Sequence, residues 1–195
     1  MKRAIMTDPE QLRSLEGQQY VVLCPTGPVA AFFDSTQEEL RAAVPTAPFP
    51  TVGHVTLRGF SEARRVGELR DEIRAWAAGI PPIELQVDAV DAFPAPFQIV
   101  VTRLARTASL VDAYSSLTDL LEATDFRRIG ELPLEQWVFH LSLIYGAAFS
   151  AEEWEALRRG AVRDIPSGPS ETVASVEFVW FEGGAEHSET IALGA

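Results

Sequence analysis

Apolar residues recur along the chain either at every second position or at every third or fourth position. The first spacing predicts strands and the second predicts helices. Strict apolar–polar alternation places successive side chains on opposite faces and predicts a half-buried strand at 83–90, with 98–104 as its hairpin partner. Runs of apolar residues bounded by proline or glycine predict further strands. The remaining expected strands lie at 20–24, from Thr51 onward, at 136–145, at 173–181 and, as an edge strand, at 187–193.

Helices are expected where apolar residues recur every three or four positions. Two such stripes are Val66-Leu69-Ile73-Trp76 and Leu110-Tyr114-Leu117-Leu121. Residue types that cap helices predict where helices begin. The expected starts are at Asp8-Pro9, at Ser35-Thr36-Gln37-Glu38 (a helix to about Val44), at Ser61 and at Ser150-Ala151-Glu152-Glu153.

Two tetrapeptides carry the same pattern of histidine, apolar residue, hydroxyl and apolar residue. They are His54-Val55-Thr56-Leu57 and His140-Leu141-Ser142-Leu143. Because side chains alternate along a strand, the histidine and the hydroxyl of each tetrapeptide share one face. The sequence therefore predicts a two-histidine site.

The tetrapeptides also open two similar runs of elements. From each histidine the chain continues as strand, short turn, helix containing Trp76 or Trp154, proline break and strand. We expect a single domain over 1–195, made of two pseudo-symmetric lobes, one carrying 54–57 and the other 140–143, with a cleft between them. Antiparallel or mixed sheets flanked by helices make the predicted class α+β.

Charge and composition narrow the functions to consider. The net charge of −12 is unfavourable for an extended nucleic-acid surface but compatible with a small phosphate ligand. No apolar run is long enough to span a bilayer, no signal-like region follows the first residues, and Cys24 is the only cysteine. We expect a cytoplasmic monomer with no membrane contact.

The paired residues suit acid–base chemistry on a phosphodiester. Imidazole titrates near neutrality, so one histidine can take a proton from a nucleophile and the other can give one to the leaving oxygen. Thr56 and Ser142 can donate hydrogen bonds to the non-bridging oxygens as negative charge develops on them. The chain offers no His-x-x-x-His or clustered carboxylate set, so we expect neither a metal nor a cofactor.

The duplicated tetrapeptide resembles the 2H phosphoesterase superfamily, which includes 2′-5′ RNA ligases and RNA 2′,3′-cyclic phosphodiesterases. The two histidines are 86 residues apart (140 − 54), and the element order is similar over about 20–181. The resemblance implies hydrolysis of a 2′,3′-cyclic phosphate of a nucleotide or RNA end to a 2′-phosphate, and 2′-5′ ligation as a further activity. It implies His54 and His140 as catalytic residues, with Thr56 and Ser142 binding phosphate.

The residues around the motifs differ from the family pattern. Many relatives have an arginine soon after the second tetrapeptide, where this chain has Ile144-Tyr145-Gly146, and Arg58 follows the first tetrapeptide instead. Arg58 could contact phosphate or form an ion pair, and Tyr145 could stack on a base or pack. The alternative functions are a noncatalytic nucleotide- or phosphate-binding module that keeps the cleft, and a structural protein whose histidines are buried.

Overall fold

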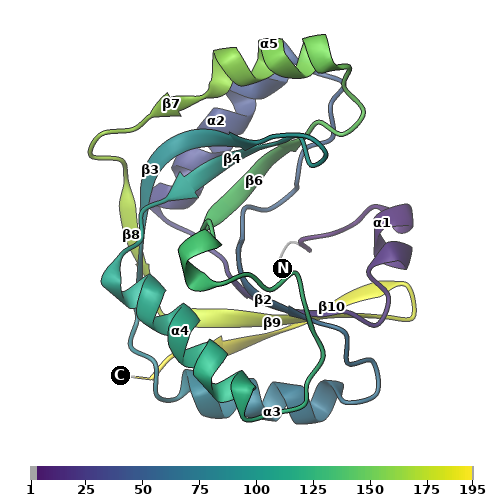
Figure 1. Cartoon of the computed structure of the whole chain (residues 1–195), viewed down its shortest axis with the longest axis vertical. Coiled ribbons are helices and arrows are strands. Elements are labelled where there is room, and N and C mark those ends of the chain that lie inside the picture. The colour runs from purple at the N-terminus through teal and green to yellow at the C-terminus, as the bar shows by residue number, and fades with distance from the viewer. Residues whose placement is uncertain (1–3, 195) are drawn as a thin grey trace.

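The computed structural model describes residues 4–194, and its centre is one ten-stranded sheet (Figure 1). The main path runs β10-β9-β1-β2-β6-β4-β3-β7, while β5 pairs with β2 and β8 with β3. The strands are β1 (Gln19–Leu23), β2 (Val55–Phe60), β3 (Ile83–Phe93), β4 (Ile99–Leu104), β5 (Arg128–Ile129), β6 (His140–Tyr145), β7 (Arg163–Asp164), β8 (Ser170–Val173), β9 (Ser175–Glu182) and β10 (Ala185–Ala192).

In the middle of the sheet, two strands are joined by a single residue pair, and we call this junction the seam. Strands β2 and β6, which carry the two tetrapeptides, pair through Val55 and Leu141 alone. On one side of the seam lie β1, β9 and β10, and on the other lie β4, β3 and β7. Each pairing in the sheet is antiparallel, for example β3 with β4 and β1 with β2. The antiparallel sheet with flanking helices confirms the predicted α+β class.

Helices flank both halves of the sheet. They are α1 (Pro9–Ser14), α2 (Pro28–Ala43), α3 (Val66–Ala77), α4 (Ala108–Glu122) and α5 (Ala151–Ala161), with a 3₁₀ turn, η1, at Leu134–Gln136. Figure 1 shows α2 and α5 against the half that contains β3, β4 and β6, α3 against β9 and β10, and α4 beside α3, where it also contacts β3. Within residues 4–194, no helix is long and apolar enough to cross a membrane.

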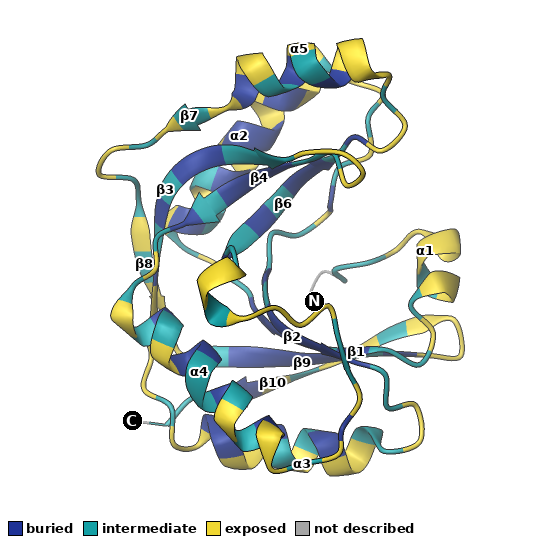
Figure 2. Ribbon diagram, viewed as in Figure 1, coloured by how far each residue is buried: buried dark blue, intermediate teal, exposed yellow. Residues whose placement is uncertain are grey.

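The predicted helical stripes form the buried faces of their helices. Leu69 and Ile73 in α3, and Leu110, Leu117 and Leu121 in α4, are fully buried. The Trp76 indole donates a hydrogen bond to the Ser116 hydroxyl, which joins α3 to α4 at 3.0 Å. Figure 2 shows the same division along α2, α3, α4 and α5, with buried residues on one face and exposed ones on the other, whereas α1 has no buried residue.

Several predicted boundaries are wrong. Helix α2 begins at Pro28, and the hydroxyls of Ser35 and Thr36 bond back to the Phe32 carbonyl inside it. Its N-terminus is instead capped from a distance, because the Glu171 carboxylate accepts hydrogen bonds from the backbone at Thr26, Gly27 and Val29. A capping box joins residues three positions apart and can be predicted from their spacing. The cap of α2 cannot, because Glu171 is distant in the sequence.

Three further element boundaries differ from those predicted from the sequence. The N-cap of α3 is Arg65 rather than Ser61. The expected strand at 173–181 divides into β8 and β9, which pair with different partners. The second tetrapeptide strand begins at His140 rather than near Gln136, because η1 ends at Gln136 and residues 137–139 form no strand. By contrast, the capping box at Ser150 is confirmed, with both reciprocal hydrogen bonds present.

The seam is stabilised by burial. Val55 and Leu141 are both 0% exposed. Gly53 lets the strands approach, because a Cβ at that position would lie 2.9 Å from Leu141 Cδ2 and 3.0 Å from the Phe33 ring. The core is therefore tightly packed behind the strands that carry the two histidines.

Replacing Leu141 by alanine should lower the free energy of unfolding by about 2–5 kcal/mol, since it leaves a cavity where the two halves meet. Urea denaturation measures the change. Leu132→Ala is the matched control, because Leu132 is 46% exposed and its truncation should cost about 0.5 kcal/mol or less. Equal losses for the two variants would contradict the role assigned to the seam.

Candidate active site

The seam brings the four motif side chains onto one face of the sheet. Val55 lies opposite Leu141 in an antiparallel pair, and both point into the core. Their neighbours point the other way, so the register sets His54 opposite Ser142 and Thr56 opposite His140. Side chains opposite each other in this way have Cβ atoms about 4.5–5.5 Å apart, and diagonal neighbours such as the two histidines are about 7–8 Å apart.

Each motif strand carries one extra residue directly after its hydroxyl residue. The pairing of β1 with β2 skips Leu57, and the pairing of β4 with β6 skips Leu143. An extra residue of this kind, a β-bulge, reverses which face the following side chains occupy. As a result Gly59 and Tyr145 return to the face of the histidines, whereas Arg58 points into the core.

The two bulges leave carbonyl groups that buried side chains satisfy. The Gln37 side-chain amide donates to the Leu143 carbonyl at 3.0 Å and to the Pro50 carbonyl at 3.1 Å. The Arg58 guanidinium donates to the Leu57 carbonyl at 3.2 Å. A buried polar group is costly without a partner, and these contacts satisfy the Gln37 amide and one end of the Arg58 guanidinium, while Arg58 Nε has no hydrogen-bond partner among the described residues.

Arg58 is therefore not brought together with the other candidate residues. Its side chain is 2% exposed, and its guanidinium lies 3.7 Å over the Tyr114 ring and bonds to the Thr118 hydroxyl. It is 3.8 Å from the Glu131 carboxylate. The sequence left open a phosphate contact or an ion pair for Arg58, and its buried position behind β2, caused by the bulge at Leu57, favours the ion pair.

Both imidazoles are held by the backbone in the same way. Nδ1 of His54 lies 3.2 Å from the Val52 carbonyl, and Nδ1 of His140 lies 2.7 Å from the Val138 carbonyl. A carbonyl can only accept, so each Nδ1 carries a hydrogen and each neutral ring has its lone pair on Nε2. The repeated contact, two residues back in each case, orients two proton acceptors alike.

Burial lowers the pKa of both histidines below the ordinary value. In each ring the hydrogen bond to the backbone carbonyl, of Val52 or Val138, opposes this decrease in pKa. A charge on His140 lowers the pKa of His54 further. Both rings are therefore neutral at pH 7 in the free protein. Because the unfolded chain binds more protons near pH 6.5, these groups reduce stability as pH falls through that value toward the folded pKa values.

Cavities lie along this face. One of about 460 Å³ is lined by His54 and Tyr145 together with the loop at 48–51 and residues 5–11, and one of about 200 Å³ adds Thr56 and Tyr20. His140 lines a smaller neighbouring cavity of about 100 Å³ with Phe93. Burial raises the pKa of Tyr145, so its phenol stays protonated and can donate.

The pairing of the strands brings two further residues, which the sequence did not predict, beside His140. Arg103 lies opposite His140 on β4 and so shares its face. Its guanidinium bonds to Asp88 at 2.9 Å and to Asp91 at 2.6 Å, which fixes its direction. The Phe93 ring meets the His140 ring edge-on, with centroids 4.9 Å apart. Nothing in the linear pattern marks these residues, because their position depends on cross-strand pairing.

The site has the parts for acid–base chemistry. It combines two proton acceptors, two hydroxyls beside them and a neutral phenol on a partly enclosed face. Among residues 4–194, no three His, Cys, Asp or Glu side chains gather in a way that could hold a metal ion.

Comparison with known proteins gives one family and a common fold. The sequence model of the 2′-5′ RNA ligase superfamily matches residues 25–184. A search of curated protein sequences gave no significant match.

Solved structures with this fold include TT0787 of Thermus thermophilus, with a TM-score of 0.66, 15% identity, and 90% of this chain and 97% of that chain covered. Escherichia coli LigT complexed with 3′-AMP has a TM-score of 0.54 and 16% identity, covering 92% and 100%. Kluyveromyces marxianus Usb1 with uridine monophosphate has a TM-score of 0.56 and 10% identity, covering 92% and 100%.

Nuclear magnetic resonance can test the state of the two rings. At pH 7.5 both should be neutral with hydrogen on Nδ1, and both should titrate below about 6.5, the ordinary histidine value. Inorganic phosphate should raise both pKa values, because a bound anion favours imidazolium. Long-range ¹H–¹⁵N spectra report the protonated nitrogen directly. Hydrogen on Nε2 of either neutral ring would contradict the assigned orientation.

Proposed function

The chain belongs to the 2′-5′ RNA ligase superfamily, and from that premise we propose that it is a phosphodiesterase that opens a 2′,3′-cyclic phosphate to a 2′-phosphate. The observation that carries the proposal is the pair of histidines on one sheet face, each with Nδ1 tied to the backbone and a hydroxyl opposite it. The reaction needs no metal ion in this scheme. Reverse 2′-5′ ligation would use the same groups.

The proposed reaction is an in-line displacement at phosphorus. One imidazole Nε2 removes a proton from water as the water oxygen bonds to phosphorus. The bond from phosphorus to O3′ breaks, and the other histidine, as imidazolium, gives its proton to O3′. The products are a 2′-phosphate and a free 3′-hydroxyl. Thr56 and Ser142 donate to the non-bridging oxygens, where charge increases.

The geometry favours His140 as the acid and His54 as the base. The His140 Nδ1 contact to its carbonyl is the shorter of the two, 2.7 Å against 3.2 Å, and this contact stabilises imidazolium. A charge on either ring disfavours protonation of the other, so the pair takes up its first proton at one histidine only. A bound phosphate anion then raises the pKa of His140 into the range where it can act at neutral pH.

Histidine substitution is the first test. His54→Ala and His140→Ala should each lower kcat on a 2′,3′-cyclic mononucleotide by about 10²–10⁴-fold, the range for loss of an acid or base. Activity should persist in excess EDTA. His187→Ala is the control, because His187 is exposed on β10 and stacks on Trp180. If the histidine variants are folded and keep wild-type turnover, His54 and His140 are not the catalytic residues. If the wild-type protein binds phosphate tightly but turns over no substrate, it is a noncatalytic module.

Leaving-group dependence separates the two roles. On a p-nitrophenyl phosphodiester of thymidine the leaving phenolate needs no proton, so the defect of His140→Ala should shrink while that of His54→Ala persists. Thr56→Val and Ser142→Ala should cost less than either histidine change on both substrates, since each removes one donor. A defect of His54→Ala that shrinks instead would reverse the assignment of acid and base.

A further inference from the structure

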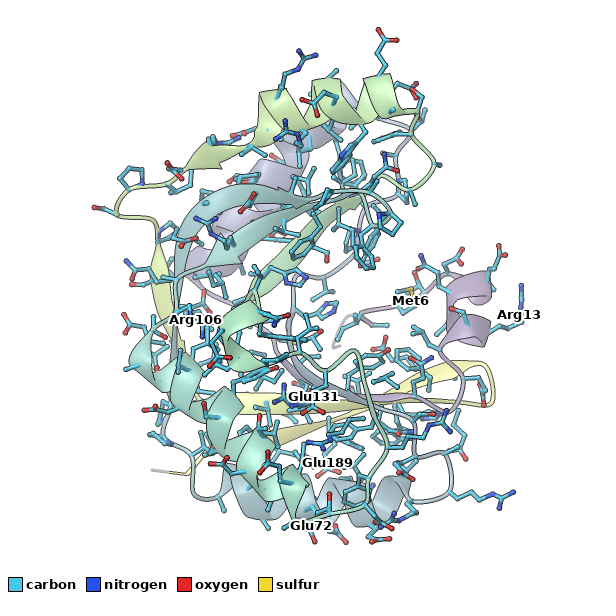
Figure 3. All side chains as sticks on the ribbon, viewed as in Figure 1. Met6, Arg13, Glu72, Arg106, Glu131 and Glu189 are labelled. Atoms are coloured by element: carbon cyan, nitrogen blue, oxygen red, sulfur yellow. The ribbon has the colours of Figure 1, made fainter. Side chains whose placement is uncertain are left out.

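Residues 5–11, which we call the N-terminal strap, lie across one side of the site. The strap precedes the part of the chain matched by the family model, which begins at residue 25. Figure 1 shows this end of the chain between the half with β4 and β6 and the half with β9 and β10, and Figure 3 shows Met6 in the same region, with Arg13 on the outer side of α1.

The strap is attached to the face that carries the motif hydroxyls. In the register of β1 with β2, Val22 lies opposite Thr56 and Tyr20 opposite Gly59, so both share the face of the histidines. Gly59 leaves room for the Tyr20 ring, since a Cβ there would lie 3.0 Å from it. An apolar cluster forms where the strap and α1 cover this face: Ile5, Met6, Leu12, Leu15, Tyr20, Val22, Cys24, Val179 and Phe181.

Polar contacts fix the strap at two points. The half-buried Glu186 carboxylate on β10 accepts from the backbone of Ile5 at 3.0 Å and of Met6 at 2.7 Å. The Asp8 carboxylate accepts from Glu10 and Gln11 and caps α1. Two charge-assisted bonds to one carboxylate, added to the apolar cluster, hold the strap as a wall of the site.

This wall is acidic where it meets the larger cavity. The cavity lined by His54 and Tyr145 is also lined by Asp8 and Glu10, and its lining among residues 4–194 includes no lysine or arginine. A cyclic phosphate between the histidines would be the only phosphate of a mononucleotide. Each additional phosphate of an RNA chain running past the strap would approach these carboxylates within about one screening length, roughly 8 Å at physiological salt.

We propose that the N-terminal strap selects small 2′,3′-cyclic nucleotides and disfavours RNA chains, through its bulk beside His54 and its carboxylates at the rim. This inference rests on the proposed function and names its substrate class. The experiment compares a 2′,3′-cyclic mononucleotide with a tetranucleotide that ends in the same cyclic phosphate. The ratio of their kcat/KM values is the readout, measured at low and high salt.

Glu10→Arg reverses one rim charge and leaves the apolar cluster intact. It should raise kcat/KM for the tetranucleotide by about tenfold at low salt and less at high salt, with the mononucleotide value within about twofold. Glu186→Gln should change the ratio in the same direction by loosening the strap, and should increase amide hydrogen exchange at Ile5 and Met6. Glu38→Arg is the charge control, because Glu38 is exposed on α2 and lines none of these cavities.

The outcomes separate the two proposals. Wild-type preference for the mononucleotide, relaxed by Glu10→Arg and not by Glu38→Arg, supports the strap as a specificity element. Equal wild-type turnover of both substrates, or an unchanged ratio in Glu10→Arg and Glu186→Gln, overturns it while leaving the phosphodiesterase intact. Turnover of neither substrate by the wild type overturns the proposed function and this inference together.

Discussion

One residue pair, Val55 with Leu141, is the constraint on which the rest of the site depends. It is the only point at which β2 and β6 pair within the described residues 4–194, and it lies at the middle of the sheet. An antiparallel pair places flanking residues on the face opposite its own side chains. Burying two aliphatic residues therefore sets two histidines and two hydroxyls on the other side. The same burial that stabilises the fold supplies the positions that the chemistry needs.

The bulges extend this arrangement beyond the tetrapeptides. A regular strand would place Tyr145 in the core and Arg58 beside the histidines. The extra residues Leu57 and Leu143 exchange these positions. Each exchange leaves a carbonyl without its ladder partner, and the molecule satisfies it with a buried side chain, Arg58 or Gln37. The buried polar residues here contribute to the hydrogen bonding of the backbone.

Local patterns predicted much of this molecule because the responsible contacts are local. Alternation and helical stripes identified most elements, and the spacing at Ser150 identified a cap whose partners lie three residues apart. The start of α2 was missed because its cap, Glu171, is more than a hundred residues away along the chain. Arg58 was misplaced for a related reason, since a bulge is defined by the partner strand. Arg103 and Phe93 depend on register between strands and carry no pattern of their own.

The difference between Gly59 and Tyr145 has a consequence for reaction direction. The two bulges make these positions equivalent, and a perfectly two-fold site would accept a five-membered cyclic phosphate equally in either of two poses. One pose would release the 3′ oxygen and the other the 2′ oxygen. Tyr145 presents a phenol from its own strand, whereas Gly59 is covered by the Tyr20 ring of β1, so the two poses differ in energy. In the proposed reaction, regiochemistry would thus come from the positions at which the two tetrapeptide strands differ, and reactivity from the histidines and hydroxyls that they share.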